Sequence, residues 1–263
     1  MRQHSSLARL LASAAVAAML AAGLGGCQTT SDITGSLSSP DADPRRAVEV
    51  YGERYRANPK DIDAALAYGQ ALRATGQRAQ AAAVLEQASI AHPGNKALLA
   101  GFGRALADNG DFEQALDVLG RAHTPDNPDW RILSVQGTVL DQLGRHDEAR
   151  RYYVSALNIM PDEPTVLSNL GLSYVLSGDL PKAEETLRKA YGSGKADARV
   201  RQNLGLVVGL QGRFAEAESI VKADLPADEA AANVAYLKQM LSRKNNPHAG
   251  AGTVPMASLS RPD

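Results

Sequence analysis

Residues 71–88 read ALRATGQRAQAAAVLEQA, and the spacing of small residues in this stretch decides the fold. Gly76 is followed five residues later by Ala81, and Leu85 comes four residues after that. Glycine is the residue that most easily ends a helix in a left-handed conformation. The stretch therefore predicts the end of one helix, a turn at Gly76, and a second helix that crosses the first closely at Ala81.

The same spacing returns every 34 residues along the chain. The turn glycine recurs at Gly76, Gly110, Gly144, Gly178 and Gly212, and an earlier glycine at Gly69, Gly103, Gly137, Gly171 and Gly205. The alanine recurs at Ala81, Ala115, Ala149, Ala183 and Ala217, and the bulky residue at Leu85, Leu119, Tyr153, Leu187 and Val221. A second alanine follows in four units, at Ala88, Ala122, Ala156 and Ala190, and Asp224 takes its place in the fifth. A fixed period of this length indicates a solenoid of stacked helix pairs, helix A and helix B of each repeat.

This pattern of small and large residues resembles the tetratricopeptide repeat. The resemblance implies an all-α solenoid, a right-handed superhelix of antiparallel helix pairs, with five full repeats in residues 62–228. Residues 45–61 match the second helix of a half repeat, and residues 229–243 are expected to form a capping helix. Residues 244–263 are polar and rich in glycine and proline, so we expect a disordered tail. The low aromatic content, 5%, agrees with an alanine-rich helical body.

Residues 1–26 have the layout of a signal peptide. Arg2 and Arg9 precede an uncharged run, residues 10–24, which as a helix would span only about 22 Å and is too short to cross a bilayer. Leu24-Gly25-Gly26-Cys27 then resembles the lipobox of bacterial lipoproteins, which implies lipidation of Cys27, with palmitate among the acyl chains. The alternative is a plain secretory peptide with an incidental thiol. Because Gln28 is not the aspartate that retains such lipoproteins at the inner membrane, the resemblance implies an outer-membrane anchor in a Gram-negative cell, with the body in the periplasm. Residues 27–44 are expected to be a disordered tether.

The charge and the motifs exclude several classes of function. The formal net charge is −1, and loss of residues 1–26 with their two arginines would make it −3, so nucleic acid is not an expected partner. The sequence has no glycine-rich phosphate loop, nucleophile elbow or metal-binding helix motif. His92 and His146 fall near predicted turns, with no partner at metal or dyad spacing. We therefore expect no enzyme activity, no cofactor, no metal site and no small-molecule substrate.

The expected functional surface is the concave face, which helix A of each repeat lines in such solenoids. Asn169 and Asn203 share one position in consecutive repeats, and an amide there can both donate to and accept from a peptide backbone. The remaining predicted groove residues are the apolar Leu172, Val175 and Leu206 and the basic Arg199. The asparagines could also be ordinary polar residues of the repeat. Leu66 and Gln70 replace the lysine and asparagine of the chaperone-binding subset, so binding of a chaperone C-terminus is not expected.

The whole layout resembles the TadD-type lipoproteins of the Flp (Tad) pilus assembly system. The resemblance rests on the lipobox, the half repeat VYGERYRANPKD (residues 50–61), PDWRILSVQG (residues 128–137) and RVRQNLGLVVGLQGRFAEAE (residues 199–218). It implies a protein-interaction scaffold for pilus or secretion apparatus assembly, with a pilus component such as the secretin as partner. Two alternatives remain: a pilotin-like or general envelope scaffold, and a scaffold that organises cell-wall enzymes.

Overall fold

The computed structural model describes residues 43–245. The predicted signal peptide, the predicted lipidation site Cys27, all but the last two residues of the predicted tether and all but the first two residues of the predicted tail lie outside the described residues. Within residues 43–245 the chain is helical, apart from short connections and one isolated β-bridge between Thr124 and Asn127. No helix in this range combines the length and the apolar character needed to cross a membrane.

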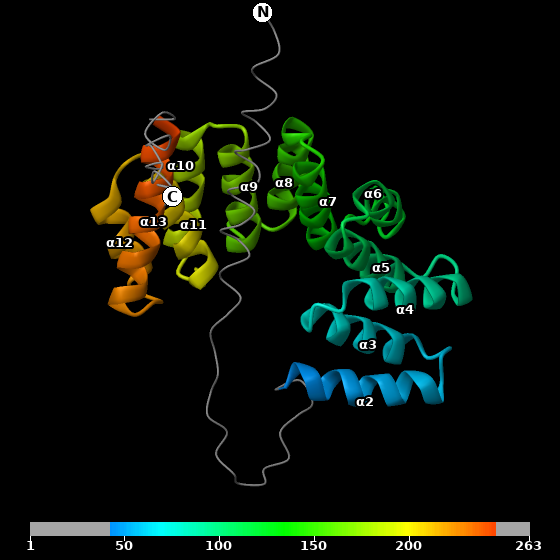
Figure 1. Ribbon diagram of the computed structural model, residues 1–263. Coiled ribbons are helices and arrows are strands. Elements are labelled where there is room, and N and C mark those ends of the chain that lie inside the picture. The colour runs from blue at the N-terminus through cyan, green and yellow to red at the C-terminus, as the bar shows by residue number, and fades with distance from the viewer. Residues whose placement is uncertain (1–42, 246–263) are drawn as a thin grey trace, which may run out of the picture.

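The helices follow one another as antiparallel pairs, preceded and closed by single helices (Figure 1). The first helix is α2 (Pro44–Ala57). The five pairs are α3 (Ile62–Ala74) with α4 (Arg78–Ala91), α5 (Lys96–Asn109) with α6 (Phe112–Arg121), α7 (Trp130–Gln142) with α8 (His146–Ile159), α9 (Pro164–Leu176) with α10 (Leu180–Gly192), and α11 (Ala198–Leu210) with α12 (Phe214–Val221). The closing helix is α13 (Ala227–Asn245), which runs two residues past each end of the predicted capping helix.

The turn inside each pair is built on its glycine, as the sequence predicts. Gly110 ends α5 with φ of 94°, and Asp111 N–H reaches back to the Leu106 carbonyl at 2.9 Å, which caps the helix. The equivalent positive-φ glycines are Gly76, Gly144, Gly178 and Gly212. The helices that open several repeats are capped by a preceding acid or amide, as at Asp61, Asn95 and Asp197.

The earlier glycine of each repeat is where helix A meets helix B. A Cβ atom added at Gly103 would lie 2.5 Å from Leu119 Cγ, a distance that packed side chains do not adopt. The other four repeats have the same contact at 2.5 to 2.6 Å, in the pairs Gly69 with Leu85, Gly137 with Tyr153, Gly171 with Leu187, and Gly205 with Val221. The pairs are therefore held at a spacing that only glycine permits.

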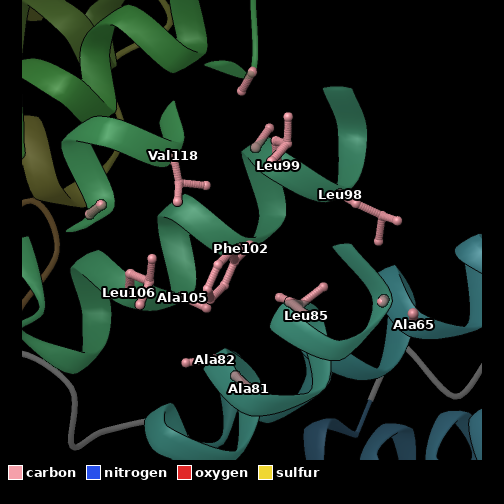
Figure 2. Close-up of a cluster of buried hydrophobic side chains, with 14 of the residues drawn as sticks. Ala65, Ala81, Ala82, Leu85, Leu98, Leu99, Phe102, Ala105, Leu106 and Val118 are labelled. Atoms are coloured by element: carbon pink, nitrogen blue, oxygen red, sulfur yellow. The ribbon is translucent and has the colours of Figure 1, made fainter. Parts of the chain in front are cut away.

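The core runs along the solenoid rather than around one centre. In the N-terminal half, alanines and leucines from α3, α4, α5 and α6 form one buried cluster, part of which is drawn in Figure 2. Ala81, Leu85 and Ala105 in this cluster are almost fully buried. Further clusters continue it through α7 to α12. Each pair thus buries its apolar faces against the next pair, as a solenoid requires.

Helix A of each repeat also contacts helix A of the next, from α3 through α5, α7, α9 and α11 to α13. The B helices α4, α6, α8, α10 and α12 pack against their own and the following A helix instead. The arch in Figure 1 follows from this arrangement. The A helices therefore form the continuous inner face, which is the surface predicted to carry the function.

Candidate functional site

The two predicted asparagines lie on this inner face, and each also joins two repeats. Asn203 Nδ2 in α11 donates to Ser168 Oγ in α9 at 2.8 Å, and Asn169 Nδ2 in α9 donates to Ser134 Oγ in α7 at 3.2 Å. Asn169 is half-buried, whereas Asn203 is only 8% exposed. One amide hydrogen of each is thus used within the stack. The side-chain oxygen of half-buried Asn169 is left to accept from a ligand backbone, whereas Asn203 is as buried as a core residue.

The apolar residues predicted for the groove separate into two kinds. Leu172 and Leu206 are half-buried, and neither packs against the buried clusters of the described residues. Val175 is different, because it is 9% exposed and belongs to the cluster that contains Leu204 and Val208. We therefore correct the predicted groove lining: Val175 is a core residue, and Leu172 and Leu206 remain candidates for the lining.

The reason for the burial of Val175 is its place in the repeat. Arg73, Asp141, Val175 and Gly209 share one register position, and their contacts point toward the next A helix. Arg73 Nε lies 2.5 Å from Asp108 Oδ2 in α5, and a Cβ at Gly209 would lie 2.5 Å from Leu237 Cδ2 in α13. This position faces the junction between repeats rather than the open groove.

Arg199, the basic residue predicted for the groove, is exposed in the first turn of α11. Its side chain forms no hydrogen bond or ion pair within residues 43–245. Its guanidinium is therefore available to a ligand. The neighbouring Arg201, in contrast, pairs with Asp224. Asp224, the exception to the second alanine, thus replaces an apolar crossing by an ion pair to α11.

A buried polar network that the sequence did not predict joins α7, α8 and α9. Asp141 is 8% exposed and accepts hydrogen bonds from Ser173 Oγ at 2.8 Å and from Tyr153 Oη at 3.0 Å. His146 Nδ1 also lies 2.8 Å from Asp141 Oδ1. Burial raises the pKa of the Tyr153 hydroxyl well above its ordinary value, and the nearby Asp141 charge raises it further. The hydroxyl therefore stays protonated and donates to the carboxylate.

This network corrects the sequence-based interpretation of His146, which has a carboxylate partner five residues away. His92 lies at the end of α4, and its Nε2 is 2.8 Å from the Lys60 carbonyl oxygen. The available signal was the combination of Tyr153 at a position where other repeats carry leucine or valine and an acid, Asp141, twelve residues before it. The hydroxyl of Ser173 bonds the carboxylate directly and not the imidazole, so the three side chains do not form a Ser-His-Asp relay.

The inner face of the first two repeats contains a cavity of about 220 Å³. Residues that line it include Leu66, Gln70, Arg73, Gly101 and Arg104, from α3 and α5. Leu66 and Gln70 are the two positions that lack the chaperone-binding residues. Among residues 43–245 no three histidine, cysteine or acidic side chains come together in a way that could hold a metal ion.

Comparison with known sequences and structures agrees with the helix-pair fold. Residues 72–136 and residues 131–193 each match a family profile described as tetratricopeptide repeat. An uncharacterized protein of Sinorhizobium fredii, y4yS, is 36% identical over 109 residues, which cover 41% of this chain and 58% of that protein. The chain thus matches little more than half the length of this relative.

Among solved structures, PilW, described as a widely conserved type IV pilus biogenesis factor, is similar with a TM-score of 0.64 and 18% identity, over 74% of this chain and 91% of that one. The Cut9-Hcn1 structure of the APC/C is similar with a TM-score of 0.63 and 18% identity, over 79% of this chain and 41% of that one. TTC0263 of Thermus thermophilus is similar with a TM-score of 0.56 and 21% identity, over 63% of this chain and 90% of that one. At these identities the likeness is one of fold, and the fold is the tetratricopeptide-repeat superhelix.

Proposed function

We propose that this tetratricopeptide-repeat chain is a non-enzymatic scaffold that holds an extended segment of a partner protein against its inner face. The observation that carries this proposal is the unbroken series of A helices. On them, half-buried Asn169 and Leu172 lie one turn apart on α9, and half-buried Leu206 has the repeat position of Leu172 on α11. An apolar strip with a few fixed polar groups is typical of a binding groove. Tetratricopeptide-repeat proteins are typically non-catalytic and bind protein partners.

The finer proposal concerns place and partner. The signal-peptide layout and the lipobox at Cys27 support a lipid anchor in the outer membrane, with the repeats in the periplasm. The resemblance to TadD-type lipoproteins supports a role in assembling the Flp (Tad) pilus apparatus. PilW, a pilus biogenesis factor, has the same fold, which is compatible with this role. At 18% identity the likeness to PilW is one of fold and not of function.

The experiment is site-specific photocrosslinking in living cells. The photoreactive residue replaces Leu172 or Leu206, and the matched control replaces Val154, which is 49% exposed on the B helix α8. We expect crosslinks from the two groove positions and not from Val154. Equal yields at all three positions would contradict groove binding.

The identity of the crosslinked protein tests the finer proposal. Recovery of the secretin or another pilus component supports a role in pilus assembly. Recovery of cell-wall enzymes alone overturns it in favour of an envelope scaffold of the second kind. Recovery of other outer-membrane assembly proteins alone indicates the pilotin-like or general scaffold.

A further inference from the structure

The cavity between α3 and α5 exists because two side chains on α5 are missing or short. Gly101 occupies the register position that carries Asn169 and Asn203 two and three repeats later, and Ala97 lies one turn before it. A Cβ atom at Gly101 would already lie 3.1 Å from Leu66 Cδ2, so a side chain there would fill the space. The space left open between α3 and α5 thus corresponds to the space that Asn169 occupies between α7 and α9 and Asn203 between α9 and α11.

One wall of this cavity is formed by Arg104, a charged side chain that has no ion-pair partner among residues 43–245. Arg104 is half-buried, and its guanidinium forms no hydrogen bond or ion pair within the described part of the chain. Arg73, on the same cavity, is already bound to Asp108. Burying a charge is costly unless it is paired, so an unpaired guanidinium in a cavity favours an incoming anion.

The surroundings of Arg104 strengthen this imbalance. Burial lowers the pKa of Arg104, the charges of Arg73 and Arg131 lower it further, and only Asp129 raises it. Asp129 is itself occupied, because its Oδ1 accepts the backbone N–H of Arg131 at 2.7 Å and caps α7. Arginine stays charged at neutral pH whatever such a shift. Three positive charges, on Arg73, Arg104 and Arg131, therefore lie near two carboxylates, of which Asp108 is bound to Arg73 and Asp129 caps α7.

We propose that this cavity receives an acidic side chain of an extended partner segment, and that its carboxylate pairs with Arg104. This inference rests on the proposed function and names the chemistry of the ligand at the opposite end of the groove. Planar guanidinium and carboxylate groups match in a two-point hydrogen-bonded pair. Gln70 offers an amide beside the pair, and Leu66 and Leu85 provide an apolar wall for the methylenes of the incoming side chain.

The size of the cavity selects a side chain rather than a free small molecule. Its volume of about 220 Å³ is below the roughly 300 to 1,000 Å³ typical of sites for drug-sized ligands. It is partly open to solvent, so the rest of a bound chain can lie outside it against the A helices. The partner segment is thus expected to place an acidic residue at repeats one and two and apolar residues at repeats four and five.

The test uses the full-length chain in detergent and two fluorescein-labelled peptides with blocked ends. One repeats serine, glutamate and leucine, and its twin has glutamine in place of every glutamate. Fluorescence anisotropy measures the binding of each to wild type, to Arg104→Gln and to the control Arg78→Gln. Arg78 is exposed at the start of the B helix α4 and, like Arg104, has no ionic partner in residues 43–245, so both variants lose one free charge.

We expect wild type to bind the glutamate peptide roughly tenfold more tightly than its twin, the effect of one charge-assisted pair. Arg104→Gln should abolish this preference, and Arg78→Gln should leave it unchanged. Equal binding of the two peptides to wild type, an equal loss in both variants, or no binding of the glutamate peptide up to about 1 mM would overturn the proposal. A third peptide, the glutamine sequence with its C-terminus left free, tests for a terminal carboxylate site. If this peptide binds and neither blocked peptide does, the proposal is overturned in favour of a site for a chain terminus.

The two proposals can fail separately. The crosslinking experiment reports whether repeats four and five hold a partner in cells, whereas the peptide experiment reports charge selectivity at repeats one and two in purified protein. Groove crosslinks from Leu172 without a preference for glutamate would leave the scaffold function standing and remove only the acidic site.

Discussion

Asn203 Nδ2 lies 2.8 Å from Ser168 Oγ, so a residue predicted to bind a ligand also fastens helix α11 to helix α9. Ser168 is 1% exposed, and loss of the amide would leave its hydroxyl with a buried, unused acceptor. The sequence alone predicts that replacing both asparagines weakens partner binding at an unchanged melting temperature. The structure changes this expectation for Asn203, whose replacement should affect both.

Leu172→Ala is therefore the cleaner test of the groove. Leu172 packs against none of the buried clusters of residues 43–245, so its truncation should cost less than about 1 kcal/mol of stability. The yield of partner crosslinked from Leu206 should fall several-fold. Asn203→Ala should lower the yield and also destabilise the fold by about 1 kcal/mol. An undiminished yield in Leu172→Ala, measured by immunoblot, would argue against the groove.

Asp141→Ala should be strongly destabilising, by about 3 kcal/mol, because Ser173 would keep a buried donor without an acceptor and His146 would lose its partner. Tyr153 would keep only its longer hydrogen bond, to Thr138 Oγ1 at 3.3 Å. Urea unfolding followed by circular dichroism measures the loss. The control is Asp108→Ala, which removes the more exposed partner of Arg73 and should cost about 1 kcal/mol or less. Similar losses in the two variants would contradict the role given to the network.

Gly103→Ala should destabilise the fold by about 1 to 3 kcal/mol, because the new methyl group would overlap Leu119. Gly120→Ala is the matched control on α6, where a Cβ atom would lie 4.0 Å from its nearest neighbour, Gln136 Nε2. Alanine there should be neutral or stabilise by up to about 1 kcal/mol through helix propensity. Thermal unfolding that ranks the two variants in the opposite order would refute the packing described for the repeat.

Glu184→Gln should weaken the acid sensitivity of the fold. Burial alone would raise the pKa of Glu184, but hydrogen bonds from Arg213, Arg188 and Gln211 hold it below its ordinary value. A carboxyl group with a lower pKa in the folded state stabilises it above its unfolded pKa, near 4.3, and this stabilisation is lost as pH falls through the folded pKa.

The melting temperature of wild type should therefore fall between about pH 5 and pH 3, and that of Glu184→Gln should fall less steeply. The control is Glu185→Gln, because Glu185 is exposed and forms no ion pair within residues 43–245. A pH profile for Glu184→Gln that parallels wild type would show that this carboxylate does not contribute.

Cys27→Ser should abolish incorporation of labelled palmitate and release the protein from the membrane fraction, because the predicted lipobox makes Cys27 the site of the acyl chains that anchor it. Cell fractionation with metabolic labelling measures both effects. Labelling that persists in Cys27→Ser, or membrane association that does not change, would contradict the anchor.

Sequence reasoning predicted the fold well because the constraint at each repeat is local. Gly103 must lie against Leu119, and Gly110 must end its helix, within one unit of 34 residues, so the period alone reveals both. The A helices of the inner face follow from the same stacking. The resemblance to a repeat family added the handedness expected of the superhelix.

The site was predicted less well because its contacts cross between repeats. One partner of Asp141, Ser173, lies 32 residues away in α9, and the unusual Tyr153 is the only sign of the buried acid within its own repeat. Val175 and Arg73 have the same register position, yet one is a core residue and the other an ion-pair partner. The unpaired state of Arg104 likewise depends on what its neighbours bind, which only the structure gives.

The Asp141 network has a consequence for folding. Repeats of one length and one pattern can dock on the wrong neighbour while the chain collapses, a characteristic failure of repeat proteins. Misdocked pairs would satisfy most alanine and leucine contacts, but the Asp141 carboxylate finds Ser173 only when α9 lies beside α7. A wrong neighbour would bury that charge with one donor too few. The network therefore favours the native order of repeats in the middle of the array, because misdocked helix pairs would lack this hydrogen bond.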